Sequence, residues 1–261
     1  MINVLEFQKM KNEGKKISMI TCYDAWSAKI IAKTNIDCIL VGDSLAMVMH
    51  GYKTTINATV DLMYTHTQAV SRCASNKFII GDMPFLSHRK GLSYMMETVQ
   101  RLEQAGAQAV KLEGAAGHLD LITHVVESGV PVMGHLGLTP QSVNLIGGYK
   151  VQGKGKHAGE TILEQALGLQ EAGCFALVLE CVPHALAKEI TEKLSIPTIG
   201  IGAGPDVDGQ VLVLHDMLGL DDHRPKFLKT YLDGKDLIHN ALNTYDEEVK
   251  KGVFPAIEHC Y

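Results

Sequence analysis

The sequence predicts a (β/α)8 barrel that forms a single domain over residues 1–261. Eight short apolar runs of strand length recur along the chain, and segments with the period of a helix separate several of them. Runs that are apolar on both faces call for a parallel sheet covered by helices. Eight strand-and-helix units in about 250 residues are the size of such a barrel. An open doubly wound sheet is the alternative that periodicity leaves open.

The predicted strands extend from residue 17 to residue 214. They cover residues 17–23, 38–42, 78–81, 109–112, 131–134, 175–179, 197–201 and 211–214. Helices are predicted where apolar residues recur at i, i+3, i+4 and i+7, most clearly over residues 92–102. Gly106 follows this helix, and Gly129 and Gly173 follow two others, at the position where glycine supplies the left-handed residue of a helix C-cap. From about residue 221 the chain is more charged, and we expect a C-terminal helical extension with a helix over 235–251.

Two connections are long enough to predict binding loops or lids. Residues 45–59 follow the second strand and residues 136–159 follow the fifth, so both lie at the C-terminal end of the barrel. The second is rich in glycine and contains Lys150, Lys154 and Lys156. We expect it to be mobile and cationic.

Composition excludes several classes of protein. Apolar residues make up 46% and charged residues 20%, as in soluble globular chains, and a net charge of -5 without a basic cluster argues against nucleic acid as a partner. No apolar stretch reaches the roughly 20 residues of a membrane helix, and the first residues lack the apolar core of a secretory signal. None of the six cysteines forms a C-x-x-C pair. We therefore expect a soluble cytoplasmic protein with reduced thiols and no membrane partner.

Acidic residues end four of the predicted strands. Asp43 and Ser44 follow the second strand, Asp82 the third, Glu113 the fourth and Glu180 the sixth. In a parallel barrel the active site lies at these C-terminal ends. A single Asp here is typically a helix cap, but three carboxylates on consecutive strands repel one another and call for a cation. Ligands that are all oxygen favour Mg2+ over zinc.

Two basic side chains and one further carboxylate complete the candidate site. Lys111 lies two residues before Glu113, so both share one face of the strand, and we expect Lys111 to pair with the acidic cluster or with an anionic substrate. Glu180 approaches from another strand, where a general base could lie. His135 is either a further polar participant or a structural histidine.

The turn at 200–204 reads G-x-G-x-G rather than G-x-G-x-x-G, which argues against a dinucleotide site.

Several segments together resemble one enzyme family over residues 17–227. They are TCYD at 21–24, VGDS at 41–44, GDMPF at 81–85, KLEG at 111–114, GHLGLTPQSVNLIGGYKVQ at 134–152, LECVP at 179–183 and IPTIGIGAGPDVDGQ at 196–210. In these segments the chain resembles ketopantoate hydroxymethyltransferase. The resemblance implies a barrel that transfers a hydroxymethyl group from 5,10-methylenetetrahydrofolate to 3-methyl-2-oxobutanoate through a Mg2+-stabilised enolate, giving 2-dehydropantoate in the first committed step of pantothenate biosynthesis. It also implies a cytoplasmic homo-oligomer, commonly a decamer.

The resemblance also assigns roles to residues by position. It implies that Asp43, Asp82 and Glu113 hold the metal, and that Glu180 accepts the proton. The implied contacts to the keto acid are Asp43, Ser44, Asp82 and Lys111. We further hypothesise that the cationic loop holds the glutamate tail of the folate. Two other interpretations stay open: a phosphoenolpyruvate mutase or isocitrate lyase type of barrel that uses no folate, and a barrel without catalytic activity.

Overall fold

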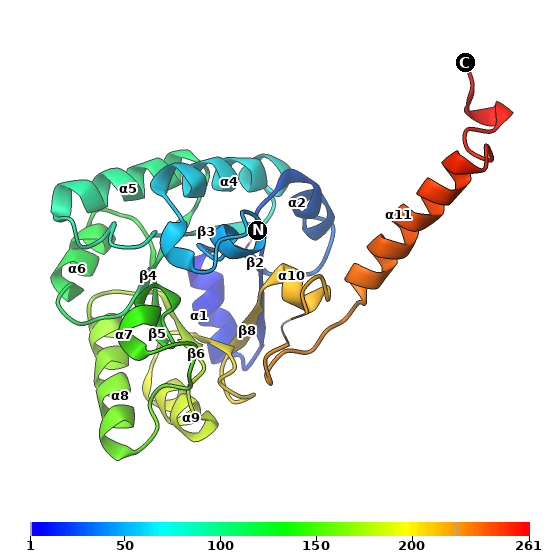
Figure 1. Cartoon of the computed structure of the whole chain (residues 1–261). Helices are drawn as coiled ribbons and strands as arrows, with labels where there is room; N and C mark the ends of the chain where they lie inside the picture. The colour runs from blue at the N-terminus through cyan, green and yellow to red at the C-terminus, as the bar shows by residue number, and fades with distance from the viewer. Residues whose placement is uncertain (1, 223) are drawn as a thin grey trace. The chain divides into compact units, whose positions relative to one another are not determined.

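Eight parallel strands close into a barrel in chain order, and the last strand pairs with the first (Figure 1). The computed structural model describes residues 2–222 and 224–261. The strands are β1 (Ile17–Thr21), β2 (Cys38–Val41), β3 (Phe78–Asp82), β4 (Ala109–Glu113), β5 (Val132–Gly137), β6 (Ala176–Glu180), β7 (Thr198–Ile201) and β8 (Gly209–Leu212). The closed sheet confirms the predicted barrel and excludes the open one, and each strand overlaps its predicted range.

Helices cover the outside of the strands, as Figure 1 shows. They are α2 (Ala25–Ile31), α4 (Val60–Cys73), α5 (Leu92–Gln104), α6 (Leu119–Glu127), α8 (Lys156–Glu171) and α9 (His184–Lys193), while the short helices α3 (Leu45–Val48) and α7 (Val143–Ile146) belong to the connections after β2 and β5. The apolar face predicted for α5 is the buried one, with Met95, Val99 and Leu102 inaccessible to solvent. The exception to the strand–helix alternation is the glycine-rich turn at 202–208, which joins β7 to β8 without a helix.

Several element boundaries differ from the sequence expectation. β5 continues to Gly137, and the connection after it contains two short helices, η2 (Pro140–Ser142) and α7, before α8 begins at Lys156. The first long connection likewise contains α3 and η1 (Thr55–Asn57). β8 begins at Gly209 because a glycine lets the chain approach β1: a Cβ there would lie 2.5 Å from the carbonyl oxygen of Ile17.

A helix that the sequence analysis did not anticipate, α1 (Val4–Asn12), packs at the N-terminal end of the barrel. The Asn3 side chain caps it by accepting hydrogen bonds from the backbone N–H groups of Leu5 and Glu6. Phe7 is fully buried, and its ring centroid lies 5.5 Å from that of Phe78 and 5.4 Å from that of Phe175. This aromatic cluster closes the N-terminal end of the barrel, so a ligand site must lie at the opposite end.

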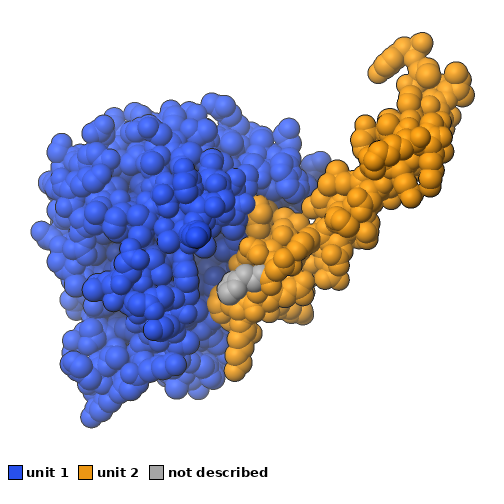
Figure 2. Space-filling model, in the orientation of Figure 1, with its two compact units in different colours: residues 1–213 blue, residues 214–261 orange. Residues whose placement is uncertain are grey.

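The chain divides into two compact units, residues 1–213 and residues 214–261 (Figure 2). The first unit is the barrel. The second contains α10 (Leu214–Met217), α11 (Gly234–Lys250), which corresponds to the predicted helix over 235–251, and η3 (Ile257–His259). All six cysteines are free. Within residues 2–222 and 224–261, no helix is both long and apolar enough to cross a membrane.

Candidate active site

The strand order brings the predicted acidic residues to one end of the barrel. β2, β3 and β4 are neighbours, so Asp43, Asp82 and Glu113 converge there. The register then pairs Asp82 with Lys111 and Glu113 with His135. All of these side chains are nearly inaccessible to solvent. A cavity of about 100 Å3 is lined by every side chain that the sequence singled out as catalytic, substrate-binding or metal-binding: Asp43, Ser44, Asp82, Lys111, Glu113 and Glu180.

A buried ion pair joins the third and fourth strands. Lys111 Nζ lies 2.7 Å from Asp82 Oδ1, and the Asp43 backbone N–H donates a hydrogen bond to Asp82 Oδ2 at 3.0 Å. Burial alone would lower the pKa of Lys111, but the three surrounding carboxylates outweigh it and raise that pKa above its ordinary value. Lys111 therefore stays charged and supplies a fixed positive charge in the cavity.

Burial has the opposite effect on the two aspartates. It raises the pKa of Asp43 well above the ordinary value, and the charges of Asp82 and Glu113 raise it further. It also raises the pKa of Asp82, although Lys111 partly offsets the effect. An additional cation in the cavity would therefore stabilise the ionised form of these two aspartates most.

His135 connects two glutamates across the barrel. Its Nδ1 lies 3.5 Å from Glu113 Oε1 and 3.3 Å from Lys111 Nζ, and its Nε2 lies 3.1 Å from Glu180 Oε2. Burial disfavours the imidazolium, but the two glutamates outweigh burial and raise the pKa of His135 to about 9. Burial likewise opposes the ionised form of Glu113, yet its contacts with His135 and Lys111 leave the pKa of Glu113 below the ordinary value. The His135 ring therefore lies between the two carboxylates at ion-pair distance, although its Nε2 makes no hydrogen bond with any described residue.

A close backbone contact fixes the position of Glu180. Gly137 is its partner in the register, and a Cβ on Gly137 would lie 2.2 Å from the Glu180 carbonyl oxygen. That carbonyl accepts a hydrogen bond from the backbone N–H of Leu138 at 2.8 Å. The next residue, Cys181, has a left-handed backbone with φ of 47°. The chain therefore turns sharply after Glu180, whose side chain is 17% exposed in the cavity.

Two polar contacts in the site were not predicted from the sequence. Gln141 is buried; its backbone N–H donates to Glu113 Oε2 at 3.0 Å and its side-chain amide donates to Asp43 Oδ2 at 2.8 Å. The Tyr23 hydroxyl lies 2.7 Å from the Ser44 hydroxyl. Gln141 lies within one of the quoted segments, but no spacing pattern distinguishes it from its polar neighbours. Tyr23 ends the first predicted strand, a position that could have identified it.

The oxygen atoms in the cavity suit a hard divalent cation. Within the part of the chain that the structure describes, no three His, Cys, Asp or Glu side chains form a ready-made ligand group. Lys111 neutralises Asp82, and Gln141 donates to Asp43. Glu113 Oε1 is buried and lies 3.5 Å from His135 Nδ1, but it accepts no hydrogen bond from any described residue. Carboxylate oxygens are the ligands that Mg2+ prefers, so the donor set fits this ion.

A closed parallel barrel with buried carboxylates, a lysine and a histidine at its C-terminal end has the architecture of a TIM-barrel enzyme. Comparison with known proteins makes this class specific. The family described as ketopantoate hydroxymethyltransferase matches residues 1–257. The chain belongs to the ketopantoate hydroxymethyltransferase family, and it is a transferase.

Similar proteins agree over the whole chain. A 3-methyl-2-oxobutanoate hydroxymethyltransferase from Coxiella burnetii (strain CbuG_Q212) is 60% identical over 263 residues, covering 100% of this chain and 99% of that protein. One from Bdellovibrio bacteriovorus (strain ATCC 15356 / DSM 50701 / NCIMB 9529 / HD100) is 60% identical over 262 residues and covers 100% of both. These relatives are enzymes, which argues against the alternative that the chain is a barrel without catalytic activity.

The fold is shared with solved structures of much lower sequence identity. A phosphonopyruvate hydrolase, crystallised with oxalate and Mg2+, superimposes with a TM-score of 0.66 at 11% identity, covering 99% of this chain and 93% of that one. A 2,3-dimethylmalate lyase of the phosphoenolpyruvate mutase and isocitrate lyase superfamily gives 0.64 at 13%, covering 100% and 93%. At such identities the likeness concerns the fold alone.

Proposed function

We propose that the chain transfers a hydroxymethyl group from 5,10-methylenetetrahydrofolate to 3-methyl-2-oxobutanoate and so produces 2-dehydropantoate for pantothenate biosynthesis. In this reaction C3 of the keto acid loses a proton and forms a C–C bond to the methylene carbon. Both C–N bonds of the methylene bridge of the folate break with their electron pairs on nitrogen, and one water supplies the hydroxyl group. The two nitrogens take up the protons that C3 and the water release. The observation that carries the proposal is the single cavity that the six assigned side chains line.

The buried charges suit an anionic keto acid. Lys111 offers a charged ammonium whose pairing with Asp82 keeps it in place, and Ser44 offers a hydroxyl group held by Tyr23. In our proposal Asp43, Asp82 and Glu113 hold Mg2+, while Asp43, Ser44, Asp82 and Lys111 contact the substrate. A bound Mg2+ would supply Lewis-acid polarisation of the keto oxygen and so stabilise the enolate.

Glu180 is the proposed base that removes the C3 proton. It approaches the cavity from β6, on the other side of His135 from the metal-binding carboxylates. The contact with His135 orients the Glu180 carboxylate, and the close packing of Gly137 holds the backbone beneath it. A base held at the reacting atom contributes roughly 10²–10⁴-fold in rate.

The test uses a half-reaction that needs no folate. With Mg2+ and 3-methyl-2-oxobutanoate in deuterated buffer, the protein should exchange the C3 hydrogen, which NMR follows directly. Glu180→Gln should bind the keto acid and lose the exchange by roughly 10²–10⁴-fold. Glu192→Gln, an exposed glutamate on α9, is the matched control and should exchange at the parental rate. Parental exchange in Glu180→Gln would overturn the assignment of the base.

The family resemblance further leads us to propose a cytoplasmic homo-oligomer, commonly a decamer. A stripe of exposed apolar residues on α11 supports association: Ile238, Leu242, Tyr245 and Val249 recur at helical spacing and are 45–63% exposed. Sedimentation equilibrium of the intact protein measures the number of subunits, and a monomer mass would contradict the proposal. We also propose that the cationic loop, with the exposed Lys150, Lys154 and Lys156, holds the folate glutamate tail.

A further inference from the structure

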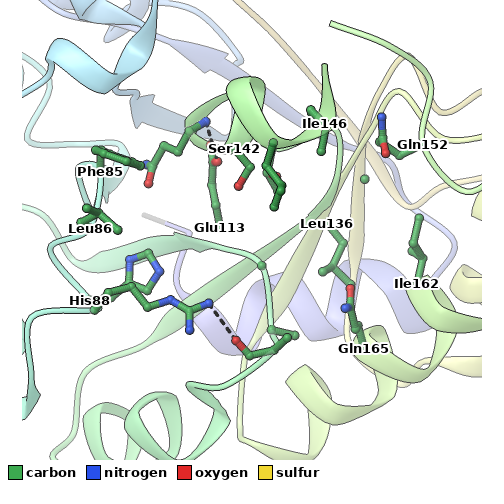
Figure 3. A pocket seen from close by; sticks show the side chains of 18 residues that line it. Phe85, Leu86, His88, Glu113, Leu136, Ser142, Ile146, Gln152, Ile162 and Gln165 are labelled. Carbon is green, nitrogen blue, oxygen red and sulfur yellow. Dashed lines mark hydrogen bonds between the residues drawn. The ribbon is translucent and has the colours of Figure 1, made fainter. Parts of the chain in front are cut away.

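A second and larger cavity adjoins the acidic one. Its volume is about 360 Å3, and it is lined by the segments that follow β3, β4 and β5 together with helix α8. Figure 3 shows Ile162 and Gln165 on one side and Phe85, Leu86 and His88 on the other, with Glu113 between them. Glu113 lines both cavities. The two cavities are therefore adjacent, and one carboxylate is shared between them.

The short helix η2 forms part of the wall between the cavities. Pro140 lines the smaller cavity, whereas Gln141 and Ser142 line the larger one. Gln141 donates hydrogen bonds to Asp43 through its side chain and to Glu113 through its backbone. This wall is therefore hydrogen-bonded to two carboxylates of the acidic site. Glu113 and Gln141 thus lie between the larger cavity and the acidic site.

The volumes separate the two cavities by the size of ligand that each can hold. The smaller one, at about 100 Å3, has less than a third of the volume of the larger one, at about 360 Å3. It suits a small keto acid and is too small for a bicyclic ring. The larger one falls in the range of about 300–1,000 Å3 that is usual for pockets that bind drug-sized ligands.

The walls of the larger cavity suit a flat ring with polar edges. Phe85, Leu136 and Ile162 provide apolar surface, and the amides of Gln152 and Gln165 provide both donors and acceptors. A pterin has an apolar face and an edge of alternating donors and acceptors. Amide side chains can match that edge whichever way the ring lies.

A buried histidine in this cavity lacks a hydrogen-bond partner. His88 is 4% exposed, and its Nδ1 makes no hydrogen bond with any described residue. Its ring packs on that of His118 at a centroid distance of 4.8 Å, and Arg89 beside it donates to the carbonyl groups of Ala116 and Gly117. Leaving such a group unpaired costs about 1–3 kcal/mol. The nitrogen has almost no exposed surface, so a polar ligand atom gains from pairing with it only where the ring turns toward the cavity.

We infer that the larger cavity binds the reduced pterin ring of the one-carbon donor, with the methylene carbon directed past Glu113 toward the keto acid. The inference rests on the proposed function, which supplies the chemical class of the donor. It assigns Gln152, Gln165 and His88 to the polar edge of the ring. It also explains why the two substrates need not compete, since each has its own cavity.

Direct binding of tetrahydrofolate, which carries no transferable carbon, tests the inference. Gln165→Leu removes one amide, and Ser142→Phe places a ring in the cavity at a serine that caps no backbone group of α7. Each should raise the Kd for tetrahydrofolate at least tenfold by calorimetry, while the Kd for the keto acid changes less than twofold. Glu164→Gln, an exposed neighbour on α8, is the control and should bind both ligands like the parent. Unchanged tetrahydrofolate binding in both cavity variants would overturn the inference.

A labelling experiment covers the case in which these variants fold poorly. Ser142→Cys places a small thiol in the cavity, and saturating tetrahydrofolate should slow its alkylation by iodoacetamide at least fivefold. The exposed Cys260 is the internal control, quantified in the same digest by mass spectrometry. Equal alkylation with and without tetrahydrofolate would also overturn the inference. If the parent protein binds tetrahydrofolate in neither experiment and performs no transfer, the proposed function itself fails.

Discussion

Replacing Lys111 by methionine removes the cation of a buried ion pair and keeps most of the side-chain volume. Lys111 Nζ lies 2.7 Å from Asp82 Oδ1, and the two side chains are only 4% and 3% exposed. Removing one partner leaves a buried charge without compensation, so we expect the variant to lose about 3–5 kcal/mol of unfolding free energy. Lys111→Met/Asp82→Asn removes both charges and should recover most of that loss.

Urea unfolding followed by far-UV circular dichroism measures these differences. The titrations are run at one protein concentration and with EDTA, so that neither subunit association nor a divalent cation changes between samples. A loss of about 0.5 kcal/mol or less for Lys111→Met, as for a surface substitution, would refute the reasoning. An equal loss in the single and double variants would refute it as well, because the effect would then not come from the unpaired carboxylate.

The same variant also tests the role of Lys111 toward the substrate. A hydrogen bond to a charged group contributes about 1.5–3 kcal/mol, so KM for the keto acid should rise roughly tenfold or more. An unchanged KM would mean that Lys111 only neutralises its carboxylate neighbours.

Three further predictions concern the backbone, a buried histidine and the metal. Gly209→Ala should cost about 1–3 kcal/mol because its Cβ would meet the Ile17 carbonyl, whereas Gly159→Ala in α8 should gain about 0.5–1 kcal/mol; equal midpoints in urea would contradict both. Burial lowers the pKa of His88 from 6.5 to about 4. As the pH falls from 6.5 to 4, the unfolded chain therefore binds a proton on this histidine that the folded chain does not bind. The stability of the parent should therefore fall relative to His88→Gln, by up to about 3 kcal/mol at pH 4, and parallel profiles would contradict this. EDTA should abolish turnover and Mg2+ restore it; full activity after exhaustive chelation would contradict the metal assignment.

Local patterns in the sequence determined the strands, most helices and the acidic residues of the site. An apolar run followed by Asp82 or Glu180 is visible in a few residues, because a buried strand must be apolar and its polar residues must lie at its end. A glycine after an amphipathic segment marks a helix end for an equally local reason. The count of eight strands favoured a barrel over an open sheet, and in a barrel Asp43, Asp82 and Glu113 converge.

The tertiary structure alone decided which other side chains complete the site. Gln141 binds Asp43 across 98 residues of sequence, and no spacing in the chain encodes such a contact. Phe7 closes the N-terminal end of the barrel from a nine-residue helix whose burial depends on two distant rings. The raised pKa of His135 comes from glutamates on two other strands, and the larger cavity lies between segments that the folded barrel brings together. The periodicity of a segment indicates which of its faces is buried. These features depend instead on which distant segments pack against that face, and local periodicity does not encode this.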